Sequence, residues 1–416
     1  MSEKLFNFPT VTLIFTSFVL GLSEFIVLGI SEDIASGLHE NIDKIVLLIT
    51  IFAWAYAIAA PVLTSVTAKM NRYRIFLLFF AVFLVANVIS FFSTTYLVLA
   101  LSRVITAAVS GVILAMALGY VPSVTAPQNI PKAIALVFAG FSIACTVGLP
   151  LGNVIVSSTH HWEYTFVAVI ALSVIVLAMS VLSLPRENAQ SNWGEQGPAP
   201  TGGMFTIVKD RRILLTMAFS IFGVGGAYVF FSAIQPLMNS FFDYDSTKVT
   251  IGLLCFGVFA LISNVSSSTV AEKGGFRMLR WIALAQVVVF LVMPTALDIG
   301  WLTGMIMVMA MGLVMYLMNS ANQMHYMEIA GKDYPQSVRL ASSFNPMTFN
   351  FGIGIGAAVC SAMMSSGESF GTIGYVAAVV SLIALVAVFL IVRIEGDPAQ
   401  QTSLLEGTAK GGDRQW

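Results

Sequence analysis

The chain has 416 residues, of which 57% are hydrophobic and 10% are charged, and its formal net charge is −1. Soluble domains carry about 25% charged residues, more than twice the share found here. A chain this apolar is not an ordinary water-soluble protein, and lipid is its expected solvent. The near-neutral charge argues against a nucleic-acid partner, which requires basic patches.

Apolar windows predict twelve membrane-spanning helices, because a bilayer core of about 30 Å requires about 20 apolar residues per helix. Six are expected near residues 8–30, 43–67, 75–93, 96–122, 132–156 and 162–184. Six more are expected near 213–237, 247–270, 277–297, 299–328, 340–365 and 369–393. The predicted fold class is an all-α membrane protein with two six-helix bundles, residues 1–184 and 213–394. A linker at 185–212 joins the bundles, and a tail follows at 395–416.

The distribution of Lys and Arg predicts the orientation, because loops on the cytoplasmic side carry an excess of basic residues. If the N-terminus is cytoplasmic, the outer loops hold Lys44 and Lys248 alone. The inner loops and tails then hold Lys4, Lys69, Arg72, Arg74, Lys132, Arg186, Lys209, Arg211, Arg212, Lys273, Arg277, Arg280, Lys332, Arg339, Arg393, Lys410 and Arg414. We therefore expect a multi-pass protein of the plasma (inner) membrane with both termini, the linker and the tail in the cytoplasm.

The two halves repeat at an offset of 204 residues, and several distinctive positions match in order. The matched sets are Gly21 with Gly225, Lys69 with Lys273, Pro131 with Pro335, and Gly148-x-Pro150-x-Gly152 with Gly352-x-Gly354-x-Gly356. A parallel six-plus-six repeat is the plan of secondary transporters in which two bundles rock about a central site.

Two deeply placed charges stand out, Glu24 in the first span and Arg103 in the fourth. An ionisable group at that depth costs about 2.5–3.5 kcal/mol and marks a functional position by default. Glu24 has two interpretations, a proton-carrying site or a structural node that fixes helix packing. Tyr228 stands at the position that matches Glu24 in the second half, so proton coupling is expected in the first half.

Several segments resemble signature motifs of the major facilitator superfamily. Gly140-Phe-Ser-Ile-Ala-Cys-Thr-Val-Gly148-Leu-Pro150-Leu-Gly152 is similar to the antiporter motif of the fifth helix, and Ser102 to Gly111 to the arginine motif of the fourth. Leu63 to Arg72 resembles a degenerate loop motif, echoed by Ala271 to Arg277. Three phrases resemble one branch of the superfamily, the twelve-helix drug:proton antiporters that include sugar, arabinose and purine efflux permeases. They are Gly21-Leu-Ser-Glu24-Phe, Leu63-Thr-Ser-Val-Thr-Ala-Lys69 and Gly148-Leu-Pro-Leu-Gly152.

The resemblance implies that the first and fourth helices are neighbours beside a central cavity, so Glu24 and Arg103 are treated as a coupled pair. It also implies a cytoplasmic gate. The expected gating residues are Lys69, Arg72, Arg74, Gly148, Pro150, Gly152, Glu272, Lys273 and Arg277. The usual acidic residue of the first loop motif is absent near Ala68, whereas Glu272 keeps it in the second half. The scaffold usually works as a monomer.

Substrate contacts are expected among polar and aromatic residues of the spans. The candidates are Trp54, Tyr56, Phe141, Tyr228, Asn319 and Asn345. For each, helix packing is the alternative role, since amides in lipid require partners and aromatic residues often fill cores.

The sequence predicts a proton-coupled transporter that exports small organic molecules by antiport, and sugars, purine bases or nucleosides, and drugs are the candidate cargoes. An uptake carrier or a lipid exporter on the same scaffold are the alternatives. An enzyme would require a clustered catalytic set, and a pump driven by a nucleotide would require a G-x-x-x-x-G-K-[ST] loop; the sequence has neither. No metal or cofactor is expected, because Cys145, Cys255 and Cys360 lack the spacing of metal ligands.

Overall fold

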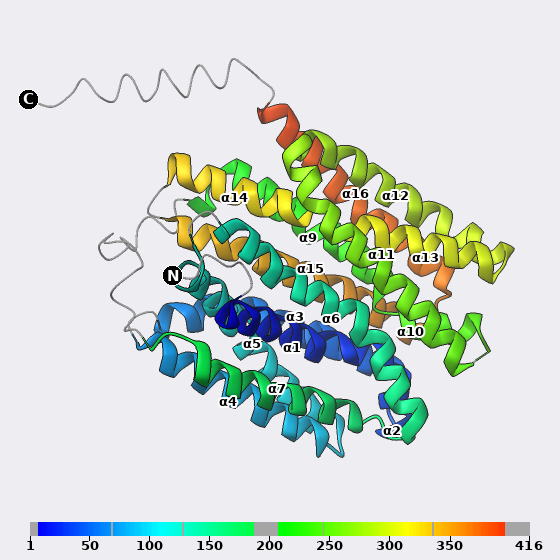
Figure 1. The fold of residues 1–416 in the computed structure, drawn as a ribbon. Helices are drawn as coiled ribbons and strands as arrows, with labels where there is room; N and C mark the ends of the chain where they lie inside the picture. The colour runs from blue at the N-terminus through cyan, green and yellow to red at the C-terminus, as the bar shows by residue number, and fades with distance from the viewer. Residues whose placement is uncertain are drawn as a thin grey trace, which may run out of the picture.

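The computed structural model describes residues 7–67, 70–126, 129–186, 207–243, 245–334 and 337–395. Within these residues, twelve helical stretches are long and apolar enough to cross a membrane, which confirms the predicted number of spans. The chain forms two groups of helices that lie side by side (Figure 1).

The first bundle contains the helices up to residue 183. They are α1 (Phe8–Phe25), the 3₁₀ segment η1 (Ile26–Ile30), α2 (Ser31–Gly37), α3 (Ile42–Thr67), α4 (Arg72–Phe91), α5 (Tyr96–Val124), α6 (Ile130–Thr159) and α7 (Tyr164–Ser183). Helix α1 packs against α5, α6 and α7, while α3 and α4 both pack against α5. Polar caps begin several of these helices; the Asn7 side chain accepts a hydrogen bond from Thr10 N, and Asn71 does the same for Arg74 N.

The second bundle repeats this plan. Its helices are α9 (Arg211–Phe231), α10 (Ile234–Phe241), α11 (Ser246–Lys273), α12 (Gly275–Ile299), α13 (Trp301–Met315), α14 (Asn319–Asp333), α15 (Val338–Ser365) and α16 (Phe370–Glu395). Helix α9 packs against α15 and α16, as α1 packs against α6 and α7. The predicted domain boundaries at 184, 213 and 394 stay a prediction.

Three of the twelve spans are interrupted, which the hydropathy of the sequence does not show. The first span changes to 3₁₀ geometry over Ile26–Ile30, and the seventh breaks between α9 and α10. The tenth, expected as one helix near 299–328, breaks between Met315 and Asn319 and continues to Asp333. No proline or glycine lies at this last break. Instead, the Tyr316 backbone N–H donates to the Ser263 hydroxyl at 3.0 Å.

The two ends of the bundles are called the Glu32 end and the Asp333 end. The Glu32 end carries α2, α10 and the last turn of α15, and the Asp333 end carries the start of α9 and the last turn of α14. Between the bundles, α3 packs against α15 and α6 packs against α11. A Cβ added to Gly354 would lie 2.0 Å from Trp54 Cδ1, and one added to Gly257 would lie 2.5 Å from Thr146 Cα. Glycine therefore permits both close approaches.

Candidate functional site

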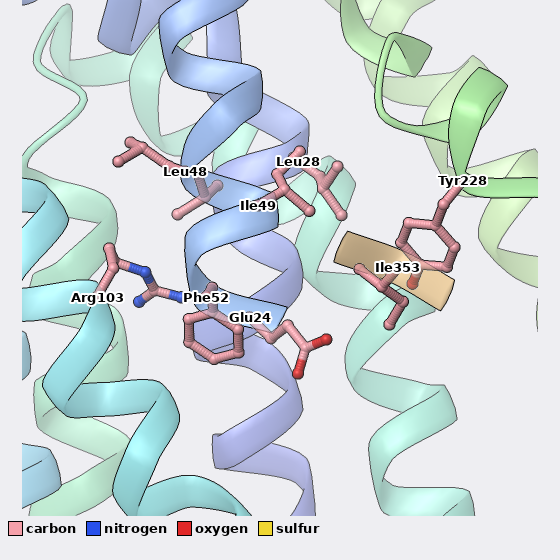
Figure 2. Close-up of a pocket in the computed structure, with 9 residues that line it drawn as sticks. Glu24, Leu28, Leu48, Ile49, Phe52, Arg103, Tyr228 and Ile353 are labelled. Carbon is pink, nitrogen blue, oxygen red and sulfur yellow. The ribbon is translucent and has the colours of Figure 1, made fainter. Parts of the chain in front are cut away.

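A pocket at the interface of the two bundles contains both deep charges of the first bundle (Figure 2). Its cavity volume is about 10 Å³, which leaves room for about one water molecule. It is lined by Glu24, Val27, Leu28, Leu48, Ile49, Phe52, Arg103, Tyr228 and Ile353. Glu24 and Tyr228, which the 204-residue repeat makes equivalent, therefore face the same space from opposite bundles.

Arg103 is held by neutral partners on the first bundle. Its side chain is 2% exposed, and its guanidinium donates to Ser23 Oγ at 3.1 Å and to the Ser23 carbonyl at 2.7 Å. The Ser23 hydroxyl in turn donates to Asn87 Oδ1 at 3.0 Å. The guanidinium carbon lies 4.5 Å from the centre of the Phe52 ring, a cation–π contact that stabilises a desolvated cation.

Glu24 forms no ion pair with Arg103, although both residues line the pocket; the ion pairs of the described residues lie elsewhere. In Figure 2 the Phe52 ring stands between the guanidinium and the Glu24 carboxylate, which points toward the side of Ile353 and Tyr228. Glu24 and Arg103 are the coupled pair predicted from the sequence. The structure brings the pair into one pocket but separates the two charges with an aromatic ring.

Tyr228 connects the pocket to the break in the tenth span. Its side chain is 1% exposed, and its hydroxyl lies 3.4 Å from the Tyr316 hydroxyl. Tyr316 is the first residue after α13. The substrate candidate Tyr228 is thus placed between Glu24 and a discontinuous helix.

The two predicted substrate amides, Asn319 and Asn345, lie together beyond this break. Asn345 Nδ2 donates to Asn319 Oδ1 at 2.7 Å, and Asn319 Nδ2 donates to Asn264 Oδ1 at 3.3 Å. Asn264 Nδ2 then donates to the Ser142 hydroxyl on α6. We call these four residues the amide relay. Asn264 is not among the substrate candidates predicted from the sequence, because spacing does not show which amides of different helices meet.

The other three substrate candidates lie outside the lining of the pocket. Trp54 is 44% exposed and packs on Gly354 of the second bundle. Tyr56 is buried and lies against Gly111, where an added Cβ would approach its ring to 3.0 Å. The Phe141 ring packs edge-on against Phe25, with centroids 5.2 Å apart. Their geometry indicates helix packing at these three positions.

The glycine–proline motif of α6 packs that helix on the first span. A Cβ at Gly148 would lie 3.3 Å from Leu22 Cδ1, and one at Gly152 would lie 2.9 Å from Ile30 Cγ2. Pro150 lies inside α6 and is buried. The motif therefore lies against the 3₁₀ segment that follows Glu24.

The charged gate candidates lie at the Asp333 end. Arg72 donates from Nη2 to the Met116 carbonyl at 3.0 Å, and its guanidinium lies 3.9 Å from the centre of the Tyr120 ring. Arg74 is exposed beside the Asn71 cap. In the second bundle, the exposed candidates are Glu272, Lys273 and Arg277. Lys69 lies outside the described residues.

A cluster of charged residues also lies at the Asp333 end, and it was not predicted from the sequence. Arg212 pairs with Asp210 at 2.7 Å and with Asp333 at 2.5 Å, so it joins the start of α9 to the end of α14. Partial burial raises the pKa of Asp210, but the hydrogen bonds and charge of Arg212 and the Tyr334 hydroxyl lower it, and the net pKa lies below the usual range. An aspartate cap followed two residues later by arginine was the available signal in the sequence.

At the Glu32 end, polar side chains join the two bundles. Gln235 Oε1 accepts from the Ser31 hydroxyl at 2.9 Å and from Glu32 N at 2.7 Å, while Gln235 Nε2 donates to Asp33 Oδ2 at 3.1 Å. Asn239 Nδ2 donates to Glu32 Oε2 at 2.6 Å. We call these five residues the clasp. Gln235 and Asn239 are both buried, at 2% and 8% exposure, so the amides of the clasp are shielded from solvent.

Comparisons with known proteins agree with this architecture. The sequence profile of the Major Facilitator Superfamily matches residues 13–339. The probable sugar efflux transporter of Mannheimia succiniciproducens is 24% identical, over 93% of this chain and 95% of that protein. The inner membrane transport protein YdhP of Escherichia coli is 26% identical, over 93% and 96%. The crystal structure of the nucleoside transporter NupG superposes with a TM-score of 0.68 at 14% identity, covering 92% of this chain and 98% of that one, which shows the shared fold.

Proposed function

The chain belongs to the Major Facilitator Superfamily and is a membrane transporter rather than an enzyme, and we propose that it exports small organic molecules in exchange for protons. The mechanism is alternating access of the central pocket, with Glu24 as the proton carrier. The proposed assembly is a monomer in the plasma (inner) membrane, with bundles 1–184 and 213–394 as the two moving units.

The observation that carries this proposal is the environment of Glu24. Its carboxylate faces a pocket shared by both bundles and forms no ion pair within the described part of the chain. A carboxylate in an apolar setting loses hydration when it is charged, so its protonation responds to any change in water access or in nearby cations. A pocket that alternately faces the two sides of the membrane supplies both changes.

The distribution of basic residues supports an orientation with the Asp333 end in the cytoplasm. Of the basic residues at the ends of the described helices, Arg72, Lys273, Arg277, Lys332 and Arg393 lie at this end. The clasp then closes the outer side. Further bonds between the bundles at that end include Ser361 Oγ to the Asp43 carbonyl at 2.7 Å and Asn153 Nδ2 to the Ser246 carbonyl at 3.0 Å. We assign this arrangement to the state closed to the outside.

The transport cycle follows from this assignment. Cargo binds from the cytoplasm while Glu24 is deprotonated, and the clasp opens as the bundles rock. A proton from outside then reaches Glu24 and favours release of the cargo, and the protonated carrier returns empty. A membrane potential contributes about 2.3 kcal/mol per charge per 100 mV, so a proton gradient with voltage can drive export against a concentration gradient.

Arg103 is proposed to tune this proton site. In the described state its charge is satisfied by Ser23 and Phe52, so it does not neutralise Glu24 directly. A shift of Phe52 during rocking would expose the carboxylate to the guanidinium and favour the deprotonated form. Lys69, Arg72 and Arg74, with Glu272, Lys273 and Arg277, are proposed to latch the cytoplasmic gate in the opposite state.

Neutral or weakly polar molecules are the proposed cargo. The pocket and the amide relay contain few charges, and one relative that matches nearly the whole chain is named a probable sugar efflux transporter. Sugars, nucleosides or purine bases, and uncharged drugs fit this description. Uptake with protons, or export of lipid, is the alternative on the same scaffold.

The test uses the purified chain in proteoliposomes with an imposed pH gradient and a panel of labelled cargoes. Glu24→Gln removes the titratable proton with little change in shape. We expect gradient-driven flux to be lost and exchange of labelled for unlabelled cargo to persist. Glu368→Gln, at an exposed position after α15, is the matched control and keeps driven flux. Unchanged driven flux in Glu24→Gln would remove the proton role.

Transport direction requires a separate measurement. Cells that express the chain are loaded with the responsive cargo, and its internal level is compared with that of cells lacking the chain. Export lowers the internal level. A higher level on expression would favour the uptake alternative.

A further inference from the structure

The break in the tenth span creates an irregular stretch of backbone beside the interface of the two bundles. Residues Tyr316 to Met318 separate α13 from α14. The Tyr316 N–H is satisfied by the Ser263 hydroxyl of α11 rather than by its own helix. Discontinuous helices in transporters place ligand sites near the bilayer midplane, because irregular backbone is tolerated there only beside protein or a cavity.

Beyond this break, two buried amides have polar atoms with no partner among the described residues. Asn345 is 3% exposed and its Oδ1 is unpaired, although its Nδ2 bonds to Asn319. Asn322 is 0% exposed, and both its Nδ2 and its Oδ1 are unpaired. Buried amides of this kind are normally satisfied. Asn345 belongs to the amide relay and Asn322 lies about one helical turn after Asn319, so these unused donors and acceptors point to a group that binds there.

An aromatic surface adjoins these amides. The Tyr316 ring stacks on Phe349 of α15, with an interplanar angle of 13° and centroids 6.4 Å apart. Phe349 follows Asn345 by four residues, so one turn of α15 presents both the amide and the ring. Apolar ring faces beside hydrogen-bonding side chains are the usual composition of a small-molecule site.

We propose that Tyr316, Phe349 and the amides Asn319, Asn322 and Asn345 form a subsite for a neutral ring-shaped ligand that carries adjacent hydrogen-bond donors and acceptors. Sugar hydroxyls and the amide edge of a nucleobase share this chemistry. None of these five side chains is charged at neutral pH, so the subsite offers no counter-ion to a cation or an anion. The inference rests on the proposed transport function, since it names the class of cargo.

The subsite touches both elements that must respond to cargo. Toward Glu24, the Tyr316 hydroxyl lies 3.4 Å from the Tyr228 hydroxyl, and Tyr228 lines the proton pocket. Toward the other bundle, Asn319 bonds to Asn264, which bonds to Ser142 of α6. A ligand that takes over the Asn319 amide competes with this connection. Cargo binding therefore releases a bond within the second bundle, at the residue (Asn264) that makes the bond to Ser142 of the first bundle.

The test measures equilibrium binding to the purified full chain in lipid nanodiscs, with no gradient. The probes are a methyl glycoside, a nucleoside and a lipophilic cation of similar size. We expect at least one neutral probe to bind, and Asn345→Leu and Phe349→Leu each to weaken that binding by about tenfold or more. Gln286→Met is the matched control. Gln286 is a buried amide that donates to the Gly223 carbonyl at 2.7 Å and has no contact with the relay, so affinity is retained.

Two results overturn the subsite: neither neutral probe binds the wild-type chain, or Asn345→Leu and Phe349→Leu leave the affinity unchanged. If Asn345→Leu fails to fold, Phe349→Leu and Asn319→Ser decide the question. Comparison of the affinities for the glycoside and the nucleoside shows whether the subsite recognises sugar hydroxyls or the amide edge of a nucleobase. Binding needs no proton gradient, so the two proposals fail separately. If the subsite variants do not change binding but flux still depends on Glu24, the subsite is wrong and the export proposal is retained. If a neutral probe binds at the subsite but Glu24→Gln does not change the driven flux, the proton role is wrong and the subsite is retained.

Discussion

Ser31 donates a 2.9 Å hydrogen bond to Gln235, a residue 204 positions later in the chain. That separation equals the offset of the sequence repeat, so the two residues occupy equivalent places in the two bundles. Equivalent positions meet where the pseudo-two-fold axis passes between the bundles. Glu24 and Tyr228 share the same separation and line the same pocket, so the axis runs through the clasp and the proton site.

The clasp predicts that Gln235→Leu shifts the chain toward a state open at the Glu32 end. The variant removes the bonds to Ser31, Glu32 and Asp33 with little change in volume. Because a net hydrogen bond contributes about 0.5–1.5 kcal/mol, we expect the loss of three bonds to shift the equilibrium by about 1.5–4.5 kcal/mol. Spin labels on cysteines introduced at His39 and Ser366, which are exposed at this end, report the distance between the bundles.

The labelling uses a chain in which the native cysteines Cys145, Cys255 and Cys360 are replaced by serine or alanine. Ser240→Ala is the control, because the Ser240 hydroxyl donates within α10 to the Leu237 carbonyl at 2.8 Å. The distance distribution should be unchanged in the control. An unchanged distribution in Gln235→Leu would show that the clasp does not hold this end closed.

Phe52→Leu is expected to move the pH midpoint of transport to lower pH. The smaller side chain no longer separates the Arg103 guanidinium from the Glu24 carboxylate, and a nearby cation favours a charged carboxylate. Initial rates of driven flux between pH 5 and pH 8 measure the midpoint. Phe76→Leu, at a fully buried ring of the same bundle away from the pocket, is the control for lost packing. A midpoint that shifts equally in both variants contradicts the screening role of Phe52.

Gly354→Ala should loosen the contact between α3 and α15. The added Cβ would lie 2.0 Å from Trp54 Cδ1 and 2.1 Å from Trp54 Nε1, so one helix or the indole must move. Overpacking of this kind costs about 1–3 kcal/mol. The melting temperature of the purified chain measures the loss, and the double variant with Trp54→Ala should recover much of it. Absence of recovery would mean that the strain lies elsewhere.

The Asp210 cluster predicts a graded effect on stability. Asp210 caps α9 by accepting from Arg212 N at 2.8 Å and also pairs with the Arg212 side chain. Asp210→Asn keeps a capping oxygen but loses the charge, whereas Asp210→Ala loses both. A lost cap costs about 1 kcal/mol, so Asp210→Ala should lower the free energy of unfolding more than Asp210→Asn does. Equal losses would assign the whole effect to the ion pair.

The same cluster has a defined pH dependence. The pKa of Asp210 lies below its usual value in the folded chain, so its contribution is present above the unfolded-state pKa of about 3.9. That contribution is lost as the pH falls through the lower folded-state pKa. Between pH 5 and pH 8 the melting temperature difference between wild type and Asp210→Asn should stay constant. Changes in transport over that range therefore report other groups, Glu24 among them.

The number of spans could be predicted from the sequence because each crossing must bury about 20 apolar residues in lipid. The repeat could also be predicted, since glycines at matched positions let α6 and α15 pack closely against the first span of their own bundles. Gly152 lies against Ile30, and Gly356 lies against Gly225, where an added Cβ would meet the carbonyl at 2.4 Å. The helix breaks could not be predicted in this way. At Tyr316 the backbone is satisfied by Ser263, 53 residues earlier, and hydropathy does not record such a partner.

The sequence by itself determined that the chain crosses a membrane twelve times in two repeated halves and that Glu24 and Arg103 are its deep charges. Solvation sets those features, because transfer of each residue to lipid depends on its own side chain. Only the tertiary structure decided the partners: Ser23 and Phe52 for Arg103, Gln235 for the end of the first span, and Asn264 and Asn345 for Asn319. Those pairings depend on how helices that are distant in sequence pack together. The sequence of one helix does not specify which side chains of another helix it will contact.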